Sequence, residues 1–252
     1  MLNSGVQKVN RICFFLLICL AFLFSSFLMP VHSAGDLSGL AAKNRKTSSG
    51  RSYLQIDVGE SKMDFEVLRP LRKNSNILLC IPAAFTSEYG GICGLYASRG
   101  QVGNENLVDR KMGGAIKIDA GKALIFDTNS GAMLDSAFAS KMRVEKTSFF
   151  QQFQIVKDGH AEGFRDKSHF QRRCIALMND GSAAVIESRG EVSFSEFGQD
   201  LVELGVQNAV YTDMGPWSEG WYRDVNSGKT IGIGDNRMMT DKQTNWFVLK
   251  RN

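Results

Sequence analysis

One stretch near the end of the chain, residues 211–224 (YTDMGPWSEGWYRD), concentrates side chains that can take part in chemistry. It holds two of the three tryptophans and three carboxylates among turn-forming residues, and Asp213 directly follows an apolar segment. Functional loops often begin at the end of a buried strand. A carboxylate there is a candidate for catalysis or ligand binding. The alternative is that Asp213 caps a turn while the aromatic side chains pack on a sheet, and the pattern leaves both interpretations open.

Several other reaction types lack the residues they need. No Gly-x-Ser-x-Gly sequence occurs, which disfavours a serine hydrolase with a nucleophile elbow. Gly232-Ile233-Gly234 follows no β-α-β unit, so it does not indicate dinucleotide binding. No Cys-x-x-Cys or spaced histidine pair is present, so the sequence predicts no metal and no cofactor. His160 and His169 are interpreted as exposed loop residues.

The cysteines favour free thiols over a disulfide framework. Cys13 and Cys19 fall in an N-terminal apolar segment, which leaves Cys80, Cys93 and Cys174 in the rest of the chain. Three cysteines allow at most one internal disulfide. Because apolar residues flank Cys80 and Cys174, we expect both to be buried as free thiols.

Strands are the main elements that must position these residues, because short apolar segments alternate with Gly, Asn and Asp. Lys157-Asp158-Gly159 and Asn179-Asp180-Gly181 are typical of tight hairpin turns. A helix is predicted where Ser193 and Glu196 form a capping box and an apolar face continues to Gly205. A second helix is predicted around 133–142. The predicted strands are 53–58, 63–68, 77–81, 115–118, 123–127, 153–156, 173–178, 183–188, 209–212 and 247–250.

These elements predict a single sheet-rich α+β domain over residues 53–252, with mixed or antiparallel sheets and a few packed helices. The N-terminus has a different character. Residues 1–33 combine a basic start, an apolar run at 12–29 and a small-residue exit, which is typical of a signal peptide cleaved near Ser33 or Ala34. An uncleaved anchor is the alternative, since the run approaches the length that spans a bilayer. Residues 34–52 are interpreted as a flexible leader.

The export signal predicts a secreted or periplasmic protein. The formal net charge is +4, and Lys8 and Arg11 of the signal peptide contribute half of it. This charge is too small to indicate nucleic acid or an anionic membrane as a partner. We therefore expect no nucleic-acid partner and no membrane contact after signal cleavage, and the sequence leaves the oligomeric state open.

Four sequence motifs follow one another between residues 77 and 252. They are Pro82-Ala83-Ala84-Phe85 with Gly94-Leu95-Tyr96; Phe153 to Gly159; Arg172-Arg173-Cys174-Ile175-Ala176; and a helix at 192–205 followed by the strand 208–212 and Asp213 to Ser218. In this order the chain resembles the phosphodiester glycosidase domain family, which includes the mannose 6-phosphate uncovering enzyme and related bacterial secreted proteins. Two positions depart from the family pattern, because Pro82 replaces an asparagine and Met214 replaces a glycine.

The resemblance implies hydrolysis of the bond between a sugar and a phosphodiester. Phosphate is a weakly basic leaving group, so the reaction needs a planar cation to hold its oxygens and a carboxylate near the anomeric carbon. The resemblance assigns these catalytic roles to Arg173 and Asp213, provided that the sheet brings the two strand ends to one edge. The predicted substrate-binding residues are Phe85, Glu88, Gly94, Tyr96, Arg172, Gly215, Trp217, Ser218, Arg223, Asn236 and Arg237.

Two functions are compatible with these observations. The first is an exported hydrolase whose substrate is a phosphorylated glycan or another sugar phosphodiester of the envelope. The second is a non-catalytic glycan- or envelope-binding domain that keeps the fold. Pro82 and Met214 favour the second, because the proline removes an amide and a backbone donor, the methionine replaces a glycine beside Asp213, and both changes reshape the site.

Overall fold

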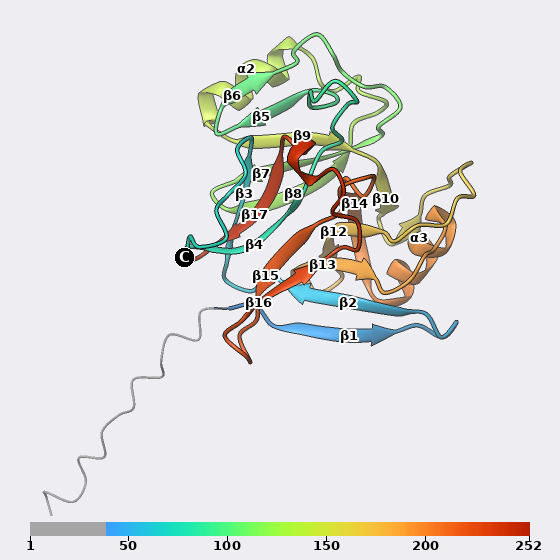
Figure 1. Ribbon diagram of the computed structural model, residues 1–252. Helices are drawn as coiled ribbons and strands as arrows, with labels where there is room; N and C mark the ends of the chain where they lie inside the picture. Colours follow the sequence, from blue (N-terminus) through green and yellow to red (C-terminus); the bar gives the residue numbers. More distant parts are fainter. Residues whose placement is uncertain (1–38) are drawn as a thin grey trace, which may run out of the picture. The chain divides into compact units, whose positions relative to one another are not determined.

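The computed structural model describes residues 39–252, so the predicted signal peptide lies outside the described residues. Within 39–252 the chain forms three sheets, whose neighbouring strands all pair antiparallel, and two α-helices (Figure 1). This architecture confirms the predicted sheet-rich α+β fold. No helix in this part of the chain is long and apolar enough to cross a membrane.

The largest sheet has seven strands and carries Asp213 at one end of β14. Its order is β1 (Ala42–Lys46), β2 (Ser52–Asp57), β13 (Ala183–Ser188), β12 (Arg173–Met178), β14 (Val206–Tyr211), β10 (Gln154–Lys157) and β11 (His160–Ala161). Both predicted hairpin turns are present, and Asp158 and Gly159 have φ of 48° and 75°. Positive φ at both central residues is the geometry that Asp-Gly provides.

The strand β1 corrects the prediction of a flexible leader. Residues 42–46 pair with β2 along their whole length, and Lys43 and Arg45 bond to Asp57 and Gln55 at 2.9 Å each. A charged edge strand needs only backbone pairing on one side, and β1 shows no apolar period because most of its residues are exposed. Composition alone therefore did not reveal it.

The other two sheets have five strands each. One has the order β16 (Thr230–Ile233), β15 (Gly220–Arg223), β4 (Ile77–Pro82), β17 (Trp246–Lys250) and β3 (Lys62–Glu66). The other has the order β6 (Gln101–Gly103), β5 (Tyr96–Ser98), β9 (Ser148–Gln152), β7 (Gly114–Asp119) and β8 (Lys122–Asp127). Apolar side chains from all three sheets meet in one core, which includes Phe65, Phe150, Ile175, Val210 and Phe247. All ten predicted strands are present.

Helix α2 (Ser136–Glu145) lies beside β6, and a short 3-10 helix (Thr240–Lys242) precedes β17 (Figure 1). The sequence placed the second helix at 133–142, three residues too early. Asp135 decides the start, because its carboxylate accepts a hydrogen bond from the Phe138 N–H at 2.8 Å and caps the first turn.

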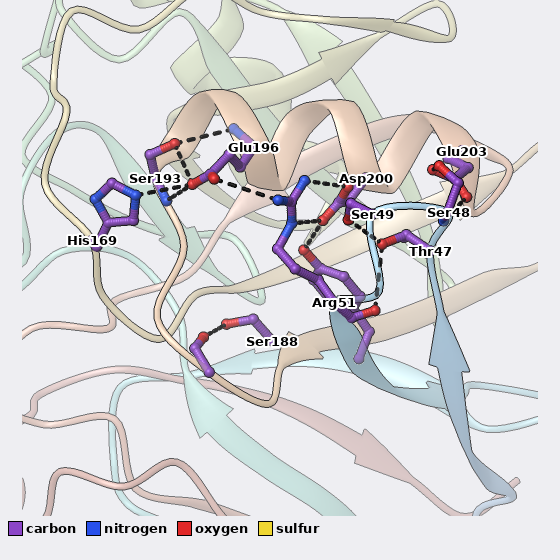
Figure 2. Close-up of polar contacts among 12 residues, drawn as sticks. Thr47, Ser48, Ser49, Arg51, His169, Ser188, Ser193, Glu196, Asp200 and Glu203 are labelled. Carbon is purple, nitrogen blue, oxygen red and sulfur yellow. Dashed lines mark hydrogen bonds and ion pairs between the residues drawn. The ribbon is translucent and has the colours of Figure 1, made fainter.

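Helix α3 (Phe194–Glu203) covers the second face of the seven-stranded sheet, and its predicted capping box is confirmed. Figure 2 shows how polar contacts hold it to the β1–β2 hairpin. Arg51 donates to both carboxylate oxygens of Asp200, at 2.6 and 2.9 Å, and the Tyr53 hydroxyl donates to the same carboxylate. At the end of the helix, Glu203 accepts from the backbone and hydroxyl of Ser48. The hairpin that begins with β1 is therefore part of the folded domain.

Candidate functional site

Asp213 is a buried carboxylate held in one orientation at the end of β14. Only 3% of the residue is exposed. Its Oδ2 accepts hydrogen bonds from the Trp217 Nε1–H at 2.6 Å and from the backbone N–H of Thr86 at 2.9 Å. Its Oδ1 lies toward Gly215, which is exposed and has no side chain. Two fixed donors on one oxygen leave the other oriented toward the loop surface.

Burial raises the pKa of the Asp213 carboxyl to about 6, although the donors from Trp217, Thr86 and Gly215 act in the opposite direction. Removal from water disfavours the charged form, and these hydrogen bonds recover only part of that cost. A carboxyl that titrates near neutrality can exist in either form under mild conditions. Strongly perturbed carboxyls of this kind are enriched at functional sites.

The turn after β4 supplies the opposite wall of this site, and polar side chains fix its backbone. Asn245 accepts from the Ala84 N–H at 2.7 Å and donates to the Ala84 carbonyl at 3.0 Å. The Ala83 carbonyl accepts from the Asp213 N–H at 3.0 Å and from Gln152 Nε2 at 3.2 Å. Because these groups are buried and paired with one another, Thr86 is held in position to donate to Asp213.

Arg173 is fully buried and is engaged within the fold. Its guanidinium forms an ion pair with the buried carboxylate of Glu187, with Nε donating at 2.7 Å, and Nη2 donates to the Ser218 carbonyl at 2.9 Å. Within residues 39–252, Nη1 has no hydrogen-bond partner. Gly234 closes over this pair, because a Cβ there would lie 2.0 Å from the Ser218 carbonyl oxygen and 2.9 Å from Arg173 Nη2.

Strand alternation places Arg172 and Arg173 on opposite faces of the seven-stranded sheet. Cys174 pairs with Tyr211, and the Thr212 N–H donates to the Arg173 carbonyl, whereas the Asp213 N–H donates to the Ala83 carbonyl. Side chains alternate between the two faces of a strand. Arg172 therefore belongs to the face of Cys174 and Tyr211, and Arg173 to the opposite face. Asp213 lies beyond the last residue of β14, so this alternation does not extend to its side chain.

The Arg172 guanidinium is also buried, and an aromatic side chain covers it. Its carbon lies 3.6 Å from the centroid of the Phe194 ring, and it donates to the carbonyls of Val192 and Ser168 at 2.8 Å each. Arg172 also contacts Tyr211 across the same face. A guanidinium stacked in this way keeps a fixed plane.

Several predicted substrate-binding residues do gather around Asp213. Trp217 bonds to it directly, and Gly215 follows it. Ser218 and Asn236 join two loops, because the Ser218 N–H donates to the Asn236 carbonyl at 2.8 Å and Asn236 N–H donates back to the Ser218 hydroxyl at 2.9 Å. Phe85 lies on the same side, with its ring 6.0 Å from that of Tyr211. Met214 is buried in the apolar cluster beneath α3.

Other predicted residues have different surroundings. Tyr96 packs against Phe65 and Gly103, and Arg223 donates to carbonyls of the 72–77 loop while covering Trp221. Glu88 and Arg237 are exposed. Gly94 packs against Gln151, where a Cβ would lie 2.7 Å from the amide oxygen.

Three residues that the sequence did not single out are essential to this geometry: Thr86, Glu187 and Asn245. Thr86 and Asn245 act through contacts distant in sequence, and Asn245 and Ala84 are 161 positions apart, whereas Glu187 lies opposite Arg173 in the β12–β13 hairpin. No local pattern marks such pairs. The weak signal that existed was polarity directly before a predicted strand, at Gln243-Thr244-Asn245.

The residues around helix α3 do not form a catalytic triad. Ser193 donates to Glu196, and His169 Nε2 lies 3.1 Å from the same carboxylate (Figure 2). A Ser-His-acid triad requires the histidine between the other two. Among residues 39–252 no cluster of three or more His, Cys, Asp or Glu side chains is suited to hold a metal, and the three cysteines there are free thiols.

Comparison with known proteins finds solved structures that resemble this fold. No protein-family model matches the sequence, and no curated protein matches it. The catalytic domain of zebrafish N-acetylglucosamine-1-phosphodiester α-N-acetylglucosaminidase, auto-inhibited by its pro-peptide, matches with a TM-score of 0.56 at 10% identity, over 84% of this chain and 82% of that chain. A hypothetical protein from Synechocystis matches with a TM-score of 0.49 at 12% identity, over 83% and 61% of the two chains. The chain therefore shares the fold of a phosphodiester glycosidase catalytic domain, as a distant structural relative.

Proposed function

We propose that this chain is an exported hydrolase that cleaves the bond between a sugar and a phosphodiester in a glycan or envelope component. The observation that carries the proposal is Asp213, a buried carboxylate with a pKa of about 6 and one oxygen fixed by two donors. The shared fold with a phosphodiester glycosidase domain supports the same reaction class. Export rests on the sequence pattern of residues 1–33.

In this proposal the ionised Asp213 stabilises or attacks the positive charge that develops at the anomeric carbon. Thr86 and Trp217 hold Oδ2, so Oδ1 is the oxygen that faces the sugar. The phosphate leaves without strong protonation because it is a weak base. Arg172, on the face of the sheet that α3 covers, attracts the phosphate, whereas Arg173 is a positioning residue that holds Ser218.

The test is sugar release by the full chain from sugar-1-phosphate diesters, including nucleotide sugars. We expect Asp213→Asn to lower kcat by roughly 100-fold or more, as for loss of a group that stabilises charge in the transition state. Asp119→Asn is the matched control, because Asp119 is an exposed aspartate at the end of β7. The activity of this variant should equal that of the wild type. Equal activity of Asp213→Asn and wild type would overturn the assignment.

A non-catalytic glycan-binding domain is the second candidate, and one observation favours it. The guanidinium groups of both Arg172 and Arg173 are used within the fold, and the two residues are only 2% and 0% exposed. A phosphate would have to displace those contacts before either arginine could bind it. Glycan binding without sugar release from any diester would support this candidate and contradict the hydrolase.

A further inference from the structure

A row of aromatic rings leads from the Asp213 site to a separate pocket. Phe85, on the turn that holds Asp213, meets Phe153 edge to face at 5.5 Å between ring centroids. Phe153 in turn meets Phe164 edge to face at 5.9 Å. Phe164 stacks on Phe194 at 4.5 Å, and Phe194 covers Arg172. The end of the row therefore packs against the buried ring of Phe194, which in turn packs against the buried guanidinium of Arg172.

The pocket has a volume of about 290 Å³, and Phe153 and Phe164 line it together with Lys111, Asp127, Lys157 and Glu162. Lys157 Nζ lies 2.6 Å from Asp127 Oδ2, and Glu162 adds to the negative field around the same ammonium. Lys111 forms no ion pair within residues 39–252. Small-molecule pockets typically start at about 300 Å³, so this one has room for a single ring.

The charged side chains that line the pocket indicate which class of ligand it suits. Two cations and two carboxylates give a net charge of zero, which provides no attraction for a free phosphate. Four charged groups exclude a purely apolar ligand, because burying them without partners is costly. Neighbouring donors and acceptors beside an aromatic wall instead match vicinal hydroxyl groups on a ring whose C–H face is apolar. That combination is a neutral pyranose.

A buried amide holds the segment that leads to the pocket. Gln151 accepts from the N–H groups of Leu95 and Asp109 at 2.8 and 3.1 Å and donates to the Asp109 carbonyl at 3.0 Å. This bridge ties the segment that leads to Lys111 to the end of the loop opposite Asp213. Burial raises the pKa of the Cys93 thiol, and the charges of Asp213 and Asp109 raise it further, so Cys93 lies within the fields of both carboxylates.

We infer that the pocket lined by Phe153, Phe164, Lys111, Asp127, Lys157 and Glu162 binds a neutral pyranose ring of the glycan whose sugar–phosphate bond is cleaved at Asp213. This inference rests on the proposed function for the identity of the substrate. It adds that the preferred substrate carries at least one sugar beyond the one that is released.

The experiment measures binding and turnover separately, with the full chain. Maltotriose, cellotriose, chitotriose and mannotriose are titrated calorimetrically into wild type, Lys111→Met and Glu162→Gln, with Lys229→Met and Glu191→Gln as exposed controls outside the pocket. We expect at least one trisaccharide to bind. Each pocket substitution should weaken it by roughly tenfold or more, as for loss of a hydrogen bond to a charged group, while the controls bind as wild type does.

The outcomes separate this inference from the proposed function. If Asp213→Asn binds the trisaccharide as tightly as wild type and no diester is cleaved by either, the pocket is supported and the hydrolase is not. If simple sugar diesters are cleaved but no trisaccharide binds, the hydrolase stands and the pocket assignment is wrong. Unchanged affinity in both Lys111→Met and Glu162→Gln would also overturn the assignment.

Discussion

Asp213→Asn should make the protein more stable at neutral pH, and the size of the gain should depend on pH. The substitution removes the charge and keeps the shape of the side chain. Its amide oxygen can still accept from Trp217 and Thr86, so the hydrogen bonds at 2.6 and 2.9 Å are conserved. What changes is the cost of burying a carboxylate.

The magnitude follows from the pKa, which is about 6 in the folded protein against an ordinary value of 3.8 for an aspartate. The difference of about two units corresponds to about 3 kcal/mol. The folded state holds the proton more tightly than the unfolded state. Wild-type stability is therefore highest below about pH 4, falls as the pH rises to about 6, and is then constant with respect to this group.

Urea unfolding of wild type and Asp213→Asn between about pH 4 and pH 7 measures this difference. The two proteins should be nearly equal at the acid end, and the variant should be about 3 kcal/mol more stable at the neutral end. Asp119→Asn should show no such divergence. A difference that is constant with pH, or a variant that is less stable at neutral pH, would refute the claim that burial of this carboxylate costs free energy.

Three further outcomes are expected. Glu187→Gln leaves the buried Arg173 without its countercharge and should lower the free energy of unfolding by about 3–5 kcal/mol in urea titrations; a loss near zero would contradict the buried pair. Gly234→Ala places a Cβ 2.0 Å from the Ser218 carbonyl at a φ of +77° and should cost roughly 2 kcal/mol or more by the same assay. Of the three thiols, only half-buried Cys93 should react with a thiol reagent in the native state, and the other two should react on unfolding.

Much of the fold could be predicted because its causes are local. The Asp-Gly pairs favour the positive φ of tight turns wherever they lie, and the hairpins that follow fix the register of β12 with β13 and of β10 with β11. The capping box of Ser193 and Glu196 starts α3 with groups three residues apart. Asp213 was found for a related reason, since it is the first charged residue after a buried strand.

The surroundings of Asp213 could not be predicted, because they come from segments far apart in the chain. Thr86 donates to a carboxylate 127 positions away, and Asn245 fixes the same turn from the segment before the last strand. The edge strand β1 was missed for a similar reason. Its place in the sheet depends on pairing with β2, whereas its own sequence, AKNRK, is charged and polar and has no apolar alternation.

The sequence by itself determined that Asp213 follows one strand and that a pair of arginines begins another. Only the tertiary structure decided that the two strands are neighbours and on which face of the sheet each arginine lies. Successive side chains on a strand point to opposite faces, so the one-residue step from Arg172 to Arg173 moves the cation across the sheet. The tertiary structure packs Arg172 against Phe194 and pairs Arg173 with Glu187.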